Sequence, residues 1–175
     1  MFVILIASFM RQTAFGFLSD FKREFGGSLL EGKRKTKRPL STKEPIHLVL
    51  KSTGNRVFSP GDRRIENLIR NQAAKCKIKV FRVSLNWTHV HAIIQIKDRK
   101  SYNSFIRTVT ALLVSLISKI KKIDLTGLFD LRPFTKIISW GRQFRNVFEY
   151  HDLNDLEAFG YVKREKKKAK QRKRK

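Results

Sequence analysis

The chain has 175 residues, of which 41% are hydrophobic, so it is long enough for one domain with a core of ordinary size. Its 39 lysines and arginines outnumber 14 acidic residues, and the formal net charge of +25 points to a polyanionic partner, with nucleic acid favoured over an acidic membrane surface. The single cysteine excludes an intrachain disulfide and a zinc site built from cysteines, and it suits a reducing compartment such as the cytoplasm.

Residues 1–45 are expected to form an N-terminal extension and a basic arm. The opening stretch, MFVILIASFMRQ, is too short to span a bilayer and lacks the positive charge that begins a signal peptide. We therefore interpret Met10 as the natural start, with a short docking strand or an export signal as the alternatives. The arm, with its GGSLLEGKRKTKRPLSTKEP, has no helical or strand period and is expected to be extended.

The arm carries a dense group of basic residues that we expect to bind phosphates, although such a group is most often a solvated linker. The group consists of Lys33, Arg34, Lys35, Lys37 and Arg38.

Residues 46–162 are expected to form the domain itself. Alternating and helical periods of apolar residues predict its elements, and Ser59 with Pro60 predicts the start of the first helix. The predicted strands are 46–52, 78–87, 89–96 and 134–140. The first predicted helix opens at Ser59 and has Ile65, Leu68, Ile69, Gln72 and Ala73 on one face, and the other two are 101–122 and 141–158. The two middle strands should form an antiparallel hairpin. This β-α-β-β-α-β-α order predicts an α+β fold of the ferredoxin-like split βαβ type with one added C-terminal helix.

Two further segments bear on partners. The apolar stretch VTALLVSLISKI is flanked by Arg107 and interrupted by Lys119, so we interpret it as a buried helix and expect no membrane span. Residues 163–175 are almost entirely basic and are expected to be a disordered tail whose affinity for phosphates falls steeply with salt.

The segment WTHVHAIIQI holds the first candidate site. Alternate residues of a strand share one face, so His89 and His91 project together with Cα atoms about 6.7 Å apart and can approach one ion. Val90, Ala92 and Ile94 fall on the opposite face, which should pack on the helices. By itself an H-x-H pair is a weak signal, because such pairs also occur without any ligand.

The final predicted helix holds the second candidate group. Tyr150 and Asn154 are four residues apart, which places them on one helix face within about 6 Å. A tyrosine can act as a covalent nucleophile, and an asparagine oxygen can bind a metal. Tyr102 and Tyr161 are alternative nucleophiles, but neither has an amide side chain four residues later.

The chain has two more histidines. His47, on the first predicted strand, is interpreted as a hydrogen-bonded strand residue rather than a ligand. His151 points about 100° away from Tyr150 around the helix, so a place in the core and a supporting place behind the ligands are both open.

The H-x-H strand, the Y-x-x-x-N helix and the element order together resemble the single-tyrosine HUH transposases, most closely the REP-associated tyrosine transposases. The resemblance covers about residues 11–162 and includes GGSLLEGKRKTKRPL, PIHLVLKS and RPFTKIISWGRQFRNVFEYHDLNDLEAFGYV. The family typically has N-H-x-H-L where this chain has THVHA, and many members have proline where this chain has Asp155. We interpret Thr88 and Asp155 as drift, because neither replaces a ligand or the nucleophile.

The resemblance implies a nuclease that cleaves and rejoins single-stranded DNA next to a hairpin. His89, His91 and Asn154 would hold Mg²⁺ or Mn²⁺, and Tyr150 would attack the phosphate to give a 5′-phosphotyrosine and a free 3′-hydroxyl. Arg142 would contact DNA together with the arm, with packing and positioning as the alternative role. Whether the protein acts as a monomer or a homodimer stays open.

Two other functions also stay open. A non-catalytic DNA- or RNA-binding protein on the same fold would need exposed aromatic side chains on its sheet, for which Phe81 and Trp87 are the candidates. A basic structural component, such as a ribosomal protein, would account for the tails but would leave the histidines, Tyr150 and Asn154 without a use.

Overall fold

A computed structural model gives the fold of residues 23–34, 36–53, 56–129 and 132–163. The predicted segments at 1–22 and 164–175, together with Lys35 of the arm, lie outside the described residues.

The described residues form an α+β fold with an open antiparallel sheet. In chain order the elements are β1 Glu24–Phe25, the 3-10 helix η1 Gly27–Leu30, β2 Ile46–Lys51, α1 Arg63–Lys75, β3 Lys79–Asn86, β4 His89–Gln95, α2 Arg99–Lys121, β5 Phe134–Ile137 and α3 Arg142–Ala158. The sheet has five strands in the order β1-β5-β2-β4-β3, and each pair of neighbours is antiparallel. The α+β class and the antiparallel β3–β4 hairpin are therefore confirmed.

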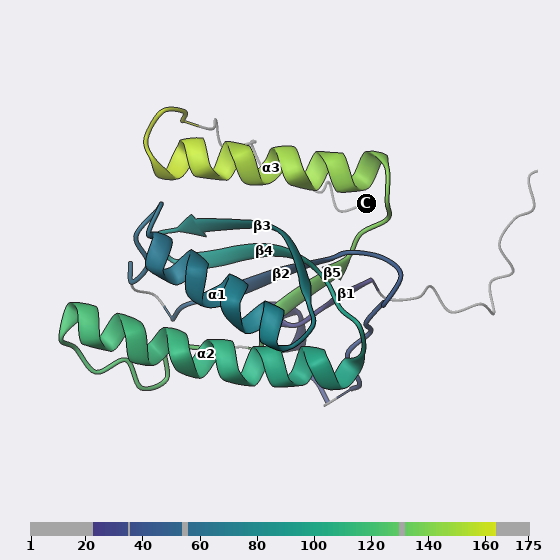
Figure 1. Ribbon diagram of the computed structural model, residues 1–175, viewed down its shortest axis with the longest axis horizontal. Coiled ribbons are helices and arrows are strands. Elements are labelled where there is room, and N and C mark those ends of the chain that lie inside the picture. The colour runs from purple at the N-terminus through teal and green to yellow at the C-terminus, as the bar shows by residue number, and fades with distance from the viewer. Residues whose placement is uncertain (1–22, 35, 54–55, 130–131, 164–175) are drawn as a thin grey trace, which may run out of the picture.

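The sheet is the middle layer of three (Figure 1). Helix α3 lies over one face, and α1 and α2 lie over the other. Strand periodicity produces this division, because every second residue of β2 and β4 is apolar. The core residues of these two strands are Ile46, Leu48, Leu50, Val90, Ala92 and Ile94. They pack with Phe105, Val109 and Leu113 of α2, so the other face of the sheet carries the residues between them.

The N-cap of helix α1 lies three residues later than predicted, at Asp62 rather than Ser59. Gly61 has φ of +73°, a left-handed conformation that a helix cannot contain. Asp62 follows it, and its side chain accepts a hydrogen bond from the backbone N–H of Arg64, as an N-cap does. Ser59 instead accepts a backbone bond from Asp62 in the preceding turn, so the cap predicted at Ser59 was wrong.

Of the helices in the described residues, α2 alone has the length and the apolar composition that a membrane span needs. One face of it is buried in the core, through Tyr102, Phe105, Val109, Leu113 and Ile117. A helix in a protein core can have the same length and composition as a membrane span. The buried face of α2 agrees with the prediction of a buried helix in this segment.

Part of the predicted arm belongs to the sheet. Strand β1 pairs with β5 through Glu24 opposite Lys136 and Phe25 opposite Thr135. Arg38 fastens the rest of the arm, because its guanidinium donates to Thr135 Oγ1 at 2.6 Å and lies 4.6 Å from the centre of the Phe25 ring. Burial lowers the pKa of Arg38 from its usual value.

Candidate functional site

The face of the sheet beneath α3 collects histidines from two strands. Within β2, His47 lies on the face opposite the core residues, and within β4 the same is true of His89 and His91. The strand register sets Val49 opposite His91 and Lys51 opposite His89. His47 is therefore diagonal to His91 on the neighbouring strand, close enough for side-chain contact.

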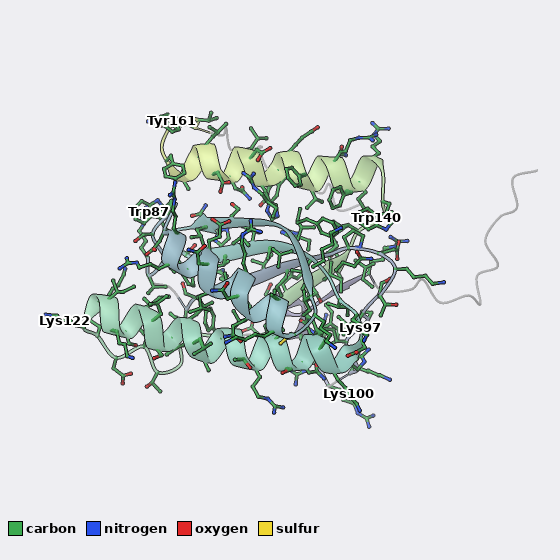
Figure 2. The ribbon with its side chains drawn as sticks, in the orientation of Figure 1. Trp87, Lys97, Lys100, Lys122, Trp140 and Tyr161 are labelled. Atoms are coloured by element: carbon green, nitrogen blue, oxygen red, sulfur yellow. The ribbon has the colours of Figure 1, made fainter. Side chains whose placement is uncertain are left out.

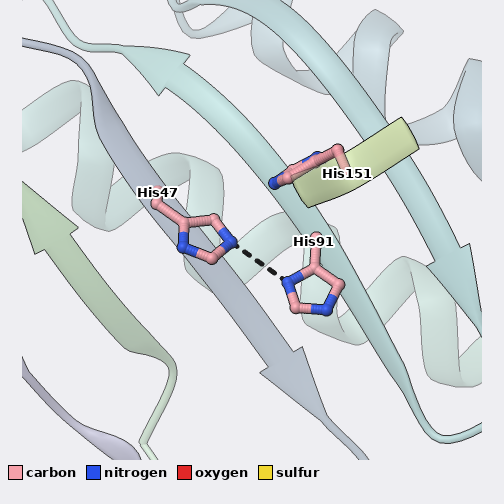
Figure 3. Close-up of side chains that lie close together, drawn as sticks. All are labelled: His47, His91 and His151. Carbon is pink, nitrogen blue, oxygen red and sulfur yellow. Dashed lines mark hydrogen bonds between the residues drawn. The ribbon is translucent and has the colours of Figure 1, made fainter. Parts of the chain in front are cut away.

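His47, His91 and His151 form a compact cluster (Figure 3). The Nε2 atom of His47 and the Nδ1 atom of His91 are 3.0 Å apart and share a hydrogen bond. His151 approaches from α3, and the ring nitrogens that the three residues offer all lie within 4.8 Å of one another. All three side chains are buried, with 8%, 4% and 0% exposure in chain order. The cluster can therefore hold a metal ion.

Burial keeps His47 and His151 of the cluster uncharged. Desolvation lowers the pKa of His47 to about 4, with smaller contributions from Lys136 and His89. It lowers the pKa of His151 to about 3, helped by His47 and Arg82. Both imidazoles are consequently neutral near pH 7, and the neutral imidazole is the form that binds a metal.

The nitrogens also fit a metal ion in number, and those of His47 and His91 fit one in spacing. Both ring nitrogens of His151 are buried, and neither has a hydrogen-bond partner among the described residues. Two imidazole nitrogens bound to one ion at about 2.1 Å lie roughly 3.0–3.4 Å apart, which matches the separation between His47 and His91. Imidazole ligands suit transition metals, whereas Mg²⁺ prefers oxygen ligands, so this donor set favours Mn²⁺ or Zn²⁺ over Mg²⁺.

The cluster should make the metal-free protein sensitive to acid. Because the folded pKa values of His47 and His151 lie below the unfolded value of 6.5, the unfolded chain binds more protons between pH 6.5 and about 4. Stability should be full above pH 6.5 and fall through this window, by about 3 kcal/mol for His47 alone. Urea unfolding in a chelating buffer at pH 7.5 and pH 4.5 measures the fall. His151→Phe should lose less stability over the same window, and a profile that stays flat in both proteins would refute the assigned protonation states.

The predicted ligands are placed differently from one another. His91 belongs to the cluster. His89 lies beside it, with ring centres 4.5 Å apart, and its Nδ1 is 3.0 Å from Thr88 Oγ1. Asn154 is buried on α3 at 4% exposure, one turn after Tyr150. Ligand roles for His89 and Asn154 stay predictions.

His47 and His151 are the residues that reasoning from the sequence did not assign to a metal. The sequence favours an ordinary strand histidine at His47, because its approach to His91 depends on the register between β2 and β4, which local sequence patterns do not specify. His151 was left between two roles. The signal for it was its position next to Tyr150 on a helix that had to cover the histidine face.

Tyr150 lies at the edge of the cluster. The centre of its ring is 5.8 Å from that of His91 and 6.3 Å from that of His47. The side chain is 39% exposed, whereas the three histidines are buried. The Tyr150 side chain is therefore next to the buried histidines and partly exposed to solvent.

An ionic clamp holds α3 over the sheet. Arg82 on β3 contacts Asp152 and Asp155 on α3, each at 2.7 Å. The hydroxyl of Ser84, on the same strand, donates a hydrogen bond to the carboxylate of Asp155. Asp152 and Asp155 lie on either side of the buried Asn154 along the helix, so the clamp fixes the segment that presents Tyr150 and His151. Asp155, which stands where many members of the resembled family have proline, thus contacts Arg82 and Ser84 in this fold.

Breaking the clamp should lower stability more than breaking a local ion pair. Arg82→Met leaves two carboxylates without their shared cation, and we expect a loss of about 1–2 kcal/mol in the free energy of unfolding. Arg70→Met removes an i,i+4 pair with Glu66 within α1 and should cost less than about 0.5 kcal/mol. Urea unfolding measures the free energy of unfolding of both variants. Equal losses would show that Arg82 is an ordinary surface residue.

The described residues that are predicted to bind nucleic acid lie in the arm and at the start of α3. Lys33, Arg34 and Lys37 are exposed, whereas Arg38 is half-buried and its guanidinium contacts protein groups. Arg142 is exposed at the first position of α3, two turns before Tyr150 and about 12 Å from it along the helix axis. Figure 2 shows the exposed Trp87 and Trp140 at opposite ends of the domain.

No model of a known protein family matches the chain, and a search of curated proteins found no match.

Proposed function

We propose that the protein is a metal-dependent endonuclease that cleaves single-stranded DNA through a covalent tyrosine intermediate. The observation that supports it most is the position of the partly exposed Tyr150 phenol, 5.8 Å in ring centres from His91 of a buried three-histidine cluster. The net charge of +25 supplies the attraction for a phosphate backbone.

The chemistry belongs to Tyr150. Its phenol oxygen forms a bond to the scissile phosphorus, and the bond from phosphorus to the 3′-oxygen breaks. The phenol releases one proton and the departing 3′-oxygen takes up one, so the step is balanced. The product is a 5′-phosphotyrosine, which keeps the energy of the phosphodiester and lets the 3′-hydroxyl of the same or another strand reverse the reaction.

His47, His91 and His151 would hold the metal, and Mn²⁺ fits their nitrogens better than Mg²⁺ does. A bound divalent cation would withdraw negative charge from the phosphate that Tyr150 attacks. The clamp between Arg82 and α3 keeps the phenol oriented towards that position. His89 and Asn154 stay predicted ligands, and substitutions separate the two ligand sets.

A ferredoxin-like fold is also part of the proposal. Without the short β1, the strand order is β5-β2-β4-β3, with α1 and α2 on one face, as a split βαβ arrangement requires. Helix α3 is the added element, and β1 extends the sheet beyond β5. A cytoplasmic location fits the single cysteine, and hairpin DNA fits as the substrate that the family resemblance implies.

Covalent capture of DNA tests the proposal. The full chain is incubated with hairpin DNA that has single-stranded flanks, in Mn²⁺ or in chelator. The DNA is labelled at its 3′ end, because the 5′-phosphotyrosine retains the fragment on that side. We expect a labelled band that survives denaturant and needs the metal. Salt-sensitive binding without any adduct would overturn the enzyme and support a non-catalytic nucleic-acid-binding protein instead.

A further inference from the structure

A pocket lies on the histidine face of the sheet, on the side towards β5 and β1. Its volume is about 330 Å³, within the range of small-ligand sites. The lining residues are Glu24, Gly26, Gly27, Ser28, Leu29, Val49, Lys51, Arg132 and Phe134. None of them belongs to the histidine cluster, and the pocket has no part in the reaction described above.

The strand register connects this pocket to the cluster. Val49 is directly opposite Phe134 on one side and His91 on the other. Phe134, Val49 and His91 thus form one row across β5, β2 and β4 on the same face. Neighbouring strands are about 4.8 Å apart, so Phe134 lies roughly 10 Å from His91. Lys51, also in the pocket, is opposite His89.

The lining combines apolar surface with positive charge. Phe134 and Val49 are half-buried on the sheet, and Leu29 is 43% exposed on η1. Lys51 and Arg132 are exposed at the pocket and carry two positive charges. The carboxylate of Glu24 is paired with Lys136 at 2.7 Å, which offsets its negative charge. The pocket therefore suits a flat apolar group that is attached to an anion.

Gly26 keeps the wall of the pocket in place. It has φ of +95°, and a Cβ there would lie 2.0 Å from the carbonyl oxygen of Pro133. The next residue, Gly27, donates its N–H to the carbonyl of Arg132 at 2.8 Å. This close approach brings η1 against the strand that carries Phe134, so the pocket is a constructed feature of the fold.

We propose that this pocket binds an unstacked nucleobase of the single strand, next to the phosphate that lies at the histidine cluster. Phe134 and Leu29 contact the base, and Lys51 and Arg132 contact the flanking phosphates. The proposal rests on the proposed function for the placement of the phosphate. In addition, a base held in this pocket would help to determine which phosphate of the strand is cleaved.

Binding measurements without cleavage test the site. All proteins carry Tyr150→Phe and all buffers contain chelator, so neither covalent chemistry nor a metal contributes. Fluorescence anisotropy gives the affinity for a labelled single strand and for a strand of equal length made of abasic sites. The measured quantity is the ratio of the two affinities, in which attraction by phosphates cancels.

Phe134→Leu keeps an apolar side chain but removes the aromatic face, and it should lower this ratio about fivefold or more. Phe134→Tyr should preserve the ratio. Leu29→Ala, at an exposed position that does not threaten folding, should lower it about twofold. Phe159→Leu, at an exposed aromatic residue after α3, should leave it unchanged.

An unchanged ratio in both Phe134→Leu and Leu29→Ala would overturn the base site. That result is separable from failure of the nuclease, since the covalent adduct is measured in the protein with Tyr150 intact. Thermal melting of each variant shows whether a loss of affinity comes from unfolding. If Phe134→Leu is unfolded, the affinity ratio of Leu29→Ala tests the base site.

Discussion

Substitution of Tyr150 by phenylalanine is expected to abolish the covalent protein–DNA adduct while leaving DNA affinity almost unchanged. Phenylalanine keeps the ring that contacts His47 and His91 but removes the oxygen that would bond to phosphorus. Because the side chain is 39% exposed, loss of its hydroxyl should have little effect on stability. Denaturing gels measure the adduct, and anisotropy measures binding with the same DNA.

The two other tyrosines of the chain provide matched controls. The Tyr102 ring is buried on α2, and burial raises the pKa of its hydroxyl to about 12, which makes it a poor nucleophile. Tyr161 is 78% exposed after α3, where its ring contacts Phe159. Tyr102→Phe and Tyr161→Phe should both form the adduct. If either loses it while Tyr150→Phe retains it, the nucleophile is assigned to the wrong residue.

Removing a histidine of the cluster is expected to reduce Mn²⁺ affinity by about 100-fold or more. Each of His47, His91 and His151 supplies a buried ring nitrogen, so each substitution removes one of the three ligands. Single substitutions to alanine, titrated with Mn²⁺ by isothermal calorimetry near pH 7.5, measure the loss. Metal at 100 times its Kd should also stabilise the unmodified protein by about 2.7 kcal/mol and each variant by far less.

His89→Ala and Asn154→Ala are the matched comparison for this experiment. The three-histidine centre predicts that both variants lose about 10-fold in Mn²⁺ affinity, the low end of the range for residues that support ligands. A loss at His89 and Asn154 as large as that at His91, with His47 and His151 unaffected, would restore the ligand set that the family resemblance implies. Folding of each variant is checked first by its circular dichroism spectrum.

Much of the fold could be predicted from the sequence, because local patterns decide it. Alternation in IHLVLK and HVHAIIQ places the histidines on one face and the core residues on the other, and β-branched runs around a short turn make the β3–β4 hairpin. The start of α1 could not be predicted as easily. Asp62 and Ser59 are both good caps, and the left-handed Gly61 between them decides in favour of Asp62.

The candidate site was harder to predict, because it depends on contacts between distant elements. His91 follows from its own strand. The part that His47 plays requires the register that sets it diagonal to His91 on β4, and that of His151 requires the rotation of α3 that Arg82 and Asp155 fix. The contacts of Arg38 could not be predicted for the same reason. Its position in a basic run predicts a phosphate contact, whereas in the structure it contacts Thr135 and Phe25.

The most direct test is to identify the residue that carries DNA after the reaction with a hairpin substrate. The adduct is digested with nuclease and trypsin, and the modified peptide is sequenced by mass spectrometry. Cleavage after Arg145 and Lys163 gives a peptide with both Tyr150 and Tyr161, so fragmentation within it must locate the phosphate. A nucleotide attached through its 5′-phosphate to Tyr150 is the predicted result. Attachment to any other residue, or the absence of any modified peptide from metal-loaded protein, would contradict the proposed nuclease.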